Sequence, residues 1–103
     1  MSSPKEIAES LISGKTVAVF SKSYCPYCTK AKKALAKLDL GDSEIGIIEL
    51  DQDSDGADIQ AYLADKTGQR TVPNIFIKGK HIGGSSDLAE LESKGELKKL
   101  VSA

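Results

Sequence analysis

The chain lacks tryptophan altogether and holds only two cysteines and a single histidine among its 103 residues. So few cysteines cannot build the disulfide framework of a small secreted scaffold. Two thiols and one imidazole also fall short of the roughly four ligands that a structural zinc site needs. The two cysteines, Cys25 and Cys28, belong to one short motif. Their spacing therefore indicates chemistry at one site rather than the cross-linking of distant loops.

Long apolar runs and a strong charge of one sign are missing as well. No apolar segment approaches the roughly 20 residues of a membrane span. The formal net charge of −1 does not indicate a polyanionic partner such as nucleic acid. Residues 1–6 have neither the apolar core of a secretory signal nor the arginine-rich bias of a transit peptide. We therefore expect a cytoplasmic protein that binds neither membrane nor nucleic acid.

The length fits a single domain, residues 1–103, which can bury roughly two-thirds of its unfolded surface. Ser3 and Pro4 predict the N-cap and first position of a helix that ends at Gly14. Further helices are expected after Cys25, stopped by Gly41, and from Asp55 as N-cap to Gly68. Short apolar and β-branched runs predict the strands. The predicted strands are 16–21, 45–50, 74–77 and 80–82.

The C-terminal part is expected to be helical. Ser85 and Ser86 are predicted to cap a helix, and residues 96–101 form a last amphipathic stretch. The first two strands are joined through a helix and should be parallel, whereas the last two flank Lys78 and Gly79 as an antiparallel hairpin. The prediction is an α/β fold with a four-stranded mixed sheet and helices on both faces.

The position of Cys25 predicts a reactive thiol. It follows the first strand and precedes a helix, so free amide groups and the helix dipole favour a negative charge there. Lys22 adds a nearby positive charge. Together these effects lower a thiol pKa from about 8.5 into a range of roughly 3.5 to 7.5. Cys28, one turn deeper, should stay protonated and act as the resolving thiol.

A zinc site, a calcium site and a purely structural role for the two cysteines are the alternatives to this interpretation. A Cys-x-x-Cys pair can ligate zinc, but besides the two thiols the chain offers only a single histidine, His81, where about four ligands are needed. The run from Asp51 to Gly56 resembles the start of an EF-hand loop, yet Tyr62 occupies the position where a bidentate glutamate is required. The cysteines could also be small buried side chains, although Pro26 does not suit a core run. We predict no metal site.

Three motifs together give the chain a family resemblance. Cys25-Pro26-Tyr27-Cys28 matches the active-site motif of the dithiol glutaredoxins, Thr71-Val72-Pro73 matches their cis-proline loop, and residues 83–88 match the segment that receives the γ-glutamyl end of glutathione. The chain therefore resembles a dithiol glutaredoxin over nearly its whole length. The resemblance implies a thioredoxin-like fold. A thioredoxin would be expected to carry Trp-Cys-Gly-Pro-Cys, and this chain has no tryptophan.

The resemblance also implies a glutathione site. Lys22, Gln60 and Arg70 would meet the glycine carboxylate, and Tyr27 would form one wall. The backbone at Thr71, Val72 and Pro73 would pair with the cysteine amides of the tripeptide as an added strand does. Close backbone approach at Gly84, the amides of Ser85 and Ser86, and the Asp87 carboxylate would receive the γ-glutamyl carboxylate and ammonium.

The implied function is a glutathione-dependent thiol–disulfide oxidoreductase. It would reduce glutathione mixed disulfides and protein disulfides through the Cys25 thiolate, as a monomer. Glutathione would be a co-substrate and no cofactor would be tightly bound. The partners would be glutathionylated and disulfide-containing proteins. A general disulfide reductase served by a reductase partner, and a carrier in which two protomers share an iron–sulfur centre, remain alternatives.

Overall fold

The computed structural model describes residues 3–102. Its elements are, in chain order, α1 (Pro4–Gly14), β1 (Val17–Ser21), α2 (Pro26–Ala36), η1 (Asp42–Glu44), β2 (Ile45–Glu49), α3 (Gly56–Thr67), β3 (Asn74–Ile77), β4 (Lys80–Gly83), α4 (Ser85–Ser93) and α5 (Glu96–Ser102). Among the described residues, no helix is both long and apolar enough to cross a membrane.

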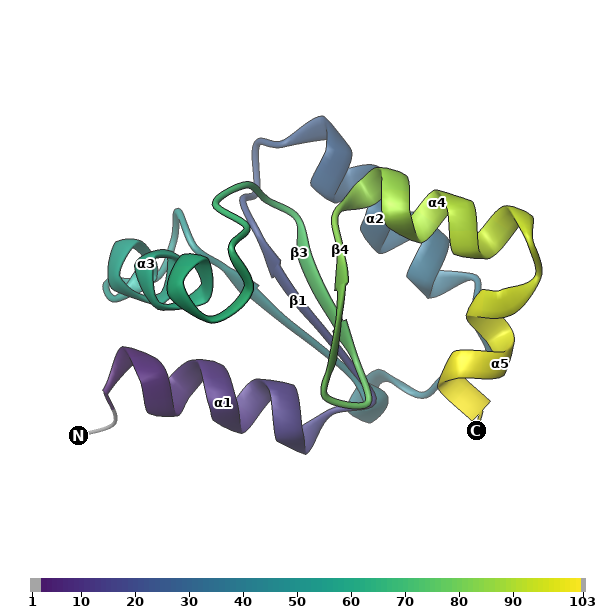
Figure 1. Ribbon diagram of the computed structural model, residues 1–103, viewed down its shortest axis with the longest axis horizontal. Coiled ribbons are helices and arrows are strands. Elements are labelled where there is room, and N and C mark those ends of the chain that lie inside the picture. Colours follow the sequence, from purple (N-terminus) through teal and green to yellow (C-terminus); the bar gives the residue numbers. More distant parts are fainter. Residues whose placement is uncertain (1–2, 103) are drawn as a thin grey trace.

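The four strands form one mixed sheet in the order β2-β1-β3-β4. β1 runs parallel to β2 and antiparallel to β3, and β3 and β4 form the hairpin. Helices α1 and α3 cover one face of the sheet, and α2 and α4 cover the other (Figure 1). This is the predicted α/β fold, a thioredoxin-like sheet flanked by helices on both faces.

Strand β1 is the centre of the core because all five of its residues are buried. Val17 and Val19 point to the apolar cluster beneath α2 and α4, whereas Ala18 and Phe20 point to the cluster beneath α1 and α3. The alternation follows from the two-residue repeat of a strand. β1 therefore carries the chain through the middle of the fold and delivers it to α2, where Cys25 lies.

Several helix ends differ from the sequence prediction. α2 ends at Ala36, with Lys37 as its C-cap residue, and therefore stops before the predicted end at Gly41. Asp55 occupies the N-cap of α3, but it contributes its backbone carbonyl, which accepts from the Ile59 amide at 2.9 Å. Gly84, rather than Ser85 or Ser86, is the N-cap of α4. The two serines therefore lie in the first turn of that helix.

Candidate active site

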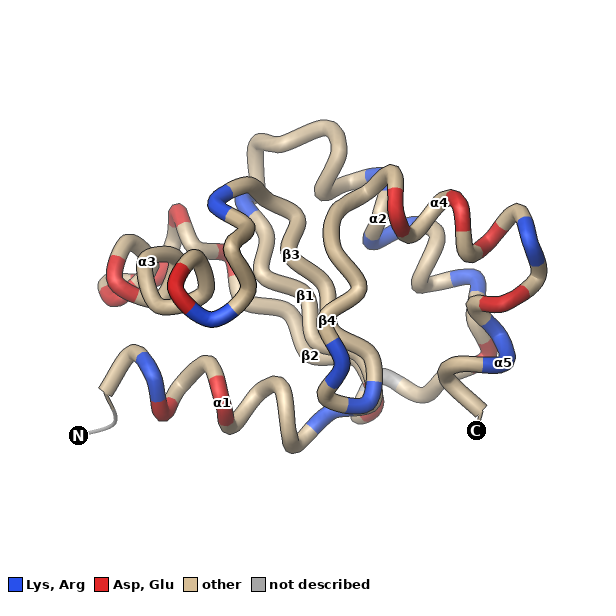
Figure 2. Tube along the Cα trace, in the orientation of Figure 1, with Lys and Arg blue, Asp and Glu red and all other residues tan. Residues whose placement is uncertain are grey.

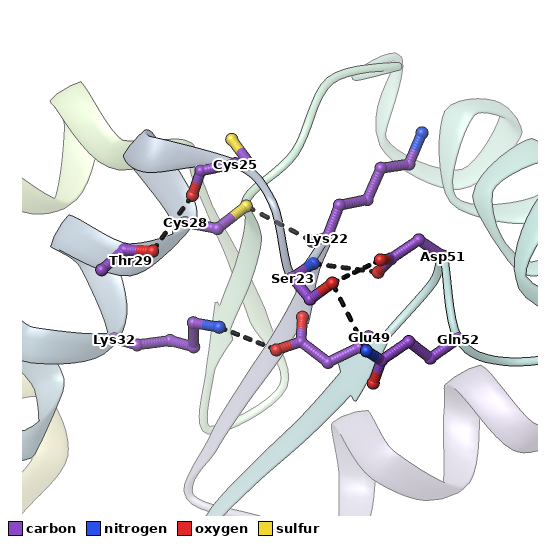
Figure 3. A network of polar contacts seen from close by, with 9 residues as sticks. All are labelled: Lys22, Ser23, Cys25, Cys28, Thr29, Lys32, Glu49, Asp51 and Gln52. Atoms are coloured by element: carbon purple, nitrogen blue, oxygen red, sulfur yellow. Dashed lines mark hydrogen bonds and ion pairs between the residues drawn. The ribbon is translucent and has the colours of Figure 1, made fainter.

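Cys25 is the N-cap residue of α2, and Pro26 takes the first helical position. The preceding loop, residues 22–24, connects it to the end of β1. Cys25 is partly exposed, Cys28 is fully buried, and both are free thiols. The motif thus presents one sulfur to solvent at the helix start and keeps the other inside. Figure 3 shows the two cysteine side chains at the start of α2.

The helix start lowers the pKa of the Cys25 thiol. The largest contribution is a hydrogen bond from the Cys28 amide; the Cys28 side chain, the Tyr27 amide and the Lys22 charge act in the same direction, against desolvation. Burial raises the pKa of Cys28, although the Lys22 amide donates to its sulfur at 3.5 Å. Both directions agree with the sequence prediction. Helix amides contribute more than Lys22, whose side chain extends away from the sulfurs (Figure 3).

Alkylation of the wild-type protein against pH should therefore give a midpoint for Cys25 well below about 8.5, the ordinary thiol value. The thiolate is fully present above its lowered pKa in the folded protein and is lost as the pH falls through that value. The rate of reaction with iodoacetamide, with the modified residue identified by mass spectrometry, measures the midpoint. A Cys25 midpoint at or above the ordinary value would contradict this assignment.

The loop before Cys25 is anchored to the chain that follows β2. The Asp51 carboxylate accepts from the Ser23 amide at 2.9 Å and from the Ser23 hydroxyl, and Gln52 Nε2 lies 3.4 Å from that hydroxyl. These hydrogen bonds from Ser23 lower the pKa of Asp51. Figure 3 shows the two segments joined at this point. This anchor was not predicted from the sequence, where Asp51 was considered only as part of the rejected calcium motif.

A groove opens at the start of α2 between three segments of the chain; Tyr27 of the motif lines it, whereas Cys25 is not among its lining residues. Its volume is about 630 Å³, and its walls come from the start of α2, the loop before β3 and the start of α4. We call it the active-site groove. Its lining residues are Tyr27, Lys30, Gln69, Thr71, Val72, Pro73, Gly84, Ser85, Ser86, Asp87 and Ala89.

Most of the residues predicted to bind glutathione are brought together there. Tyr27, exposed over 63% of its surface, stands on the α2 side. Thr71, Val72 and Pro73 form the facing loop, and the Val72–Pro73 peptide is cis, as predicted. Gly84, Ser85, Ser86 and Asp87 supply the α4 side.

The α4 side offers amides and one carboxylate to the groove. Asp87 Oδ2 accepts from the Gly84 amide at 2.9 Å, which fixes the carboxylate beside the helix start. Its other oxygen remains available to a cation. The first-turn amides of Ser85 and Ser86 suit an anion by the usual preference of a helix N-terminus. A ligand with a carboxylate next to an ammonium group would match this end of the groove.

Lys22, Gln60 and Arg70 lie outside the walls of the groove. Gln60 and Arg70 line a separate hollow of about 270 Å³ with alanines of α3, where Gln60 Nε2 donates to the Arg70 carbonyl at 2.9 Å. Lys22 precedes the motif and is partly buried. The residues predicted to bind glutathione therefore form two groups. One group lines the groove, and the other, which consists of Lys22, Gln60 and Arg70, lies outside it.

Gln69 is a groove residue that the sequence analysis missed. Its side-chain amide donates to the Thr71 carbonyl at 3.1 Å and to the Pro73 carbonyl at 3.0 Å. One side chain thereby holds both ends of the loop that forms one wall of the active-site groove. Such a partnership with backbone carbonyls leaves no pattern in the sequence, because any polar residue can occupy a loop position.

The described part of the chain groups no three His, Cys, Asp or Glu side chains closely enough to hold a metal ion. What the site offers is an acidic thiol at a helix N-terminus, a buried second thiol one turn away, and a groove for a small ligand or peptide. This arrangement on a thioredoxin-like fold defines a thiol–disulfide oxidoreductase.

Comparison with known proteins identifies the family. The Glutaredoxin family model matches residues 17–82. Glutaredoxin-1 of Rhizophagus irregularis is 52% identical over 103 residues, covering 100% of this chain and 99% of that protein. A glutaredoxin of Ricinus communis is 52% identical over 91 residues, which are 88% of this chain and 86% of the relative. The chain belongs to the glutaredoxin family.

Solved glutaredoxin structures share the fold. The holo form of glutaredoxin C1 from Populus tremula x tremuloides superposes with a TM-score of 0.88 at 40% identity, over 96% of this chain and 95% of that one. A buckwheat glutaredoxin–glutathione complex gives a TM-score of 0.87 at 43% identity, over 96% and 86% of the two chains.

Proposed function

We propose that the protein is a glutathione-dependent oxidoreductase that reduces glutathione mixed disulfides and protein disulfides. Cys25 is the nucleophile and Cys28 the resolving thiol. The observation that carries the proposal is the placement of Cys25 as the partly exposed N-cap of α2, where helix amides favour its thiolate, two residues before Tyr27 in the wall of the active-site groove. Membership of the glutaredoxin family and the glutathione complex of the buckwheat relative support the choice of glutathione.

Glutathione would lie along the groove with its sulfur at Cys25. The amides of Ser85 and Ser86 bind its γ-glutamyl carboxylate, and Asp87 binds its ammonium group. The backbone of Val72 pairs with the amides around its cysteine, and Tyr27 flanks it. The glycine carboxylate reaches towards Lys22, Gln60 and Arg70, which lie beyond the groove. Opposite charges at the two ends fix the direction of the tripeptide.

The reaction begins when the Cys25 thiolate attacks the glutathione sulfur of a mixed disulfide. The sulfur–sulfur bond of the substrate breaks, the target protein leaves as a thiolate, and glutathione stays on Cys25. A second glutathione then attacks this intermediate, which yields glutathione disulfide and restores the thiolate. In the reduction of a protein disulfide, Cys28 instead attacks the mixed disulfide on Cys25 and closes the internal disulfide.

Turnover of a glutathionylated peptide with glutathione as the sole reductant tests the proposal. We expect release of the peptide thiol in proportion to enzyme, and none above background with Cys25→Ser. Turnover that requires a separate reductase protein would favour the thioredoxin-like alternative. An absorbance band in the visible range of anaerobically purified protein would favour the iron–sulfur carrier.

Charge at both ends of the glutathione site should affect the kinetics. Lys22→Ala and Asp87→Ala are each expected to raise the apparent KM for the glutathionylated peptide about two- to fivefold, as exposed ion pairs contribute roughly 0.2 to 1 kcal/mol. Lys33→Ala and Asp65→Ala, at exposed positions elsewhere on α2 and α3, are the matched controls. Unchanged KM values in the Lys22→Ala/Asp87→Ala double variant would refute this placement of glutathione.

The proposal includes a monomeric protein in the cytoplasm that uses glutathione as a co-substrate and holds no tightly bound cofactor. Its partners are then glutathionylated and disulfide-containing proteins. Sedimentation of the purified protein and fractionation of cells that express it test the first two points.

A further inference from the structure

A small polar cluster lies beneath the buried thiol, on the face of the sheet that packs against α2. Ser21 and Glu49 end β1 and β2 and are partners in the parallel register. Ser21 points to the same face as Val17 and Val19, which pack under α2 and α4. Lys32 follows Cys28 by one helical turn and faces the same way. We call Ser21, Lys32 and Glu49 the sub-thiol cluster.

Two atoms of this cluster are buried without a hydrogen-bond partner. Among the side chains that the structure describes, Ser21 Oγ and Glu49 Oε1 are the buried oxygens that lack one. Glu49 Oε2 is bound to Lys32 Nζ at 2.7 Å, and both side chains are only 24% exposed. A buried oxygen without a hydrogen-bond partner is energetically costly. Because both lie in one cluster under Cys28, a function in the thiol chemistry would account for their retention.

The Ser21 hydroxyl connects the cluster to the thiol. It lies close enough to Cys28 to oppose the rise in the pKa of that thiol, although it forms no well-aligned hydrogen bond within the described residues. On its other side is the neighbouring strand, about 4.8 Å away, where Glu49 is its register partner. Ser21 Oγ and Glu49 Oε1 are not hydrogen-bonded to each other in this structure, so proton transfer requires the two side chains to come together. Lys32 binds one carboxylate oxygen of Glu49, and Figure 3 shows the second directed towards the loop of residues 22–24.

We propose that Glu49, acting through the Ser21 hydroxyl, accepts the proton of Cys28 when Cys28 resolves a mixed disulfide on Cys25. Cys28 is fully buried, so an acceptor inside the protein would serve its proton directly. Lys32 fixes Glu49 Oε2 and thereby leaves Oε1 as the free acceptor.

The step balances in atoms and electrons. The Cys28 thiol passes its proton to Ser21 Oγ while the Ser21 hydroxyl proton moves to Glu49 Oε1. The Cys28 sulfur forms a bond to the Cys25 sulfur, and the bond between Cys25 and the substrate sulfur breaks. The substrate leaves with that electron pair as a thiolate and is reduced, whereas the two cysteines are oxidised to a disulfide. When glutathione later reduces this disulfide, Cys28 takes the proton back by the reverse path.

The inference rests on the proposed function, and its test separates the two. Wild type, Glu49→Gln and Ser21→Ala are assayed on a protein disulfide, which needs Cys28, and on a glutathionylated peptide, which does not. Loss of a general base typically slows its step by about 10²-fold or more, so we expect both variants to lose at least about tenfold on the protein disulfide. Their rates on the peptide should stay within about twofold of wild type, which also shows that they fold.

Two further readouts exclude a merely structural role. In a Cys28→Ser background, Glu49→Gln should change neither rate, because no Cys28 proton is left to accept. In the wild-type background, the defect of Glu49→Gln should shrink as the pH rises, since hydroxide then removes the Cys28 proton directly. The groups around that thiol are the Cys25 sulfur, the Lys22 amide and Ser21, with Lys32 and Glu49 beneath. Glu92→Gln, at an exposed position on α4, is the matched control.

Equal losses on both substrates, or no loss on the protein disulfide, would overturn the inference while leaving the proposed function intact. A wild-type protein that reduces neither substrate with glutathione would overturn the proposed function itself.

Discussion

Cys25→Ser is expected to abolish the reduction of both glutathionylated peptides and protein disulfides, by roughly a thousandfold or more, as removal of an attacking nucleophile does elsewhere. Cys28→Ser should retain the first activity and lose the second by at least about tenfold, because the resolving thiol then no longer acts within the same molecule. The expected contrast follows from the different positions of the two sulfurs.

The Cys25 thiolate should survive the second substitution. The largest influence that lowers its pKa is the backbone amide of residue 28, which a serine retains. A second glutathione can therefore still resolve the intermediate formed on Cys25. The rate on the peptide could even exceed that of wild type, since the competing internal disulfide cannot form. Assay of both variants on both substrates, with glutathione as reductant, measures the contrast. A Cys28→Ser variant as inactive as Cys25→Ser on the peptide would exclude the one-cysteine route.

Gly83→Ala is expected to produce the second large effect, a roughly tenfold rise in KM for glutathionylated peptide, equivalent to about 1.4 kcal/mol of binding free energy. Gly83 has a φ of +122°, and a Cβ there would lie 2.3 Å from Asp87 Oδ2 and 2.8 Å from Asp87 Cγ. The methyl group would displace the carboxylate that accepts from the Gly84 amide. The proposed ammonium site would thereby be lost together with the backbone geometry at the start of α4.

Gly79→Ala is the matched control for this variant. Gly79 also has a positive φ, +81°, but a Cβ there would project into open space in the β3–β4 turn. Both variants should lose about 1 to 3 kcal/mol of stability because alanine is strained at positive φ. Only Gly83→Ala should change KM. Chemical denaturation and peptide kinetics on the two proteins separate strain from loss of the site, and equal KM changes would contradict the role given to Asp87.

Local signals in the sequence predicted much of the fold. At the start of α1 the Ser3 hydroxyl accepts from the Glu6 amide at 3.1 Å, and Glu6 accepts from the Ser3 amide in return, so the whole device lies within four residues. The predicted end of α2, at Gly41, was wrong because the prediction relied on apolar spacing. Leu38 continues the apolar spacing and is buried, but the helix has already ended at Ala36. Apolar spacing reports burial, which a turn can provide as well as a helix.

The candidate site likewise has features that local sequence predicts and features that depend on distant partners. The position of Cys25 at the helix start follows from a strand, a short loop and a proline, all of them local. Asp51 and Gln69 act through partners that sequence patterns do not encode: a loop residue 28 positions away for Asp51, and backbone carbonyls for Gln69. The positions of Gln60 and Arg70, beside the groove rather than in it, depend on how α3 packs against the sheet.

Charged residues lie on the helices, on the loops and on the outer strands β2 and β4, whereas β1, which leads to the motif, carries none (Figure 2). Amide hydrogens of β1 are hydrogen-bonded between two neighbouring strands and shielded by apolar clusters on both faces. Their exchange with deuterium should therefore require opening of the whole fold, and they should be among the slowest in the protein. Cys25, the proposed nucleophile, thus follows a strongly protected strand by a short loop, so continuous turnover should leave the exchange of β1 unchanged.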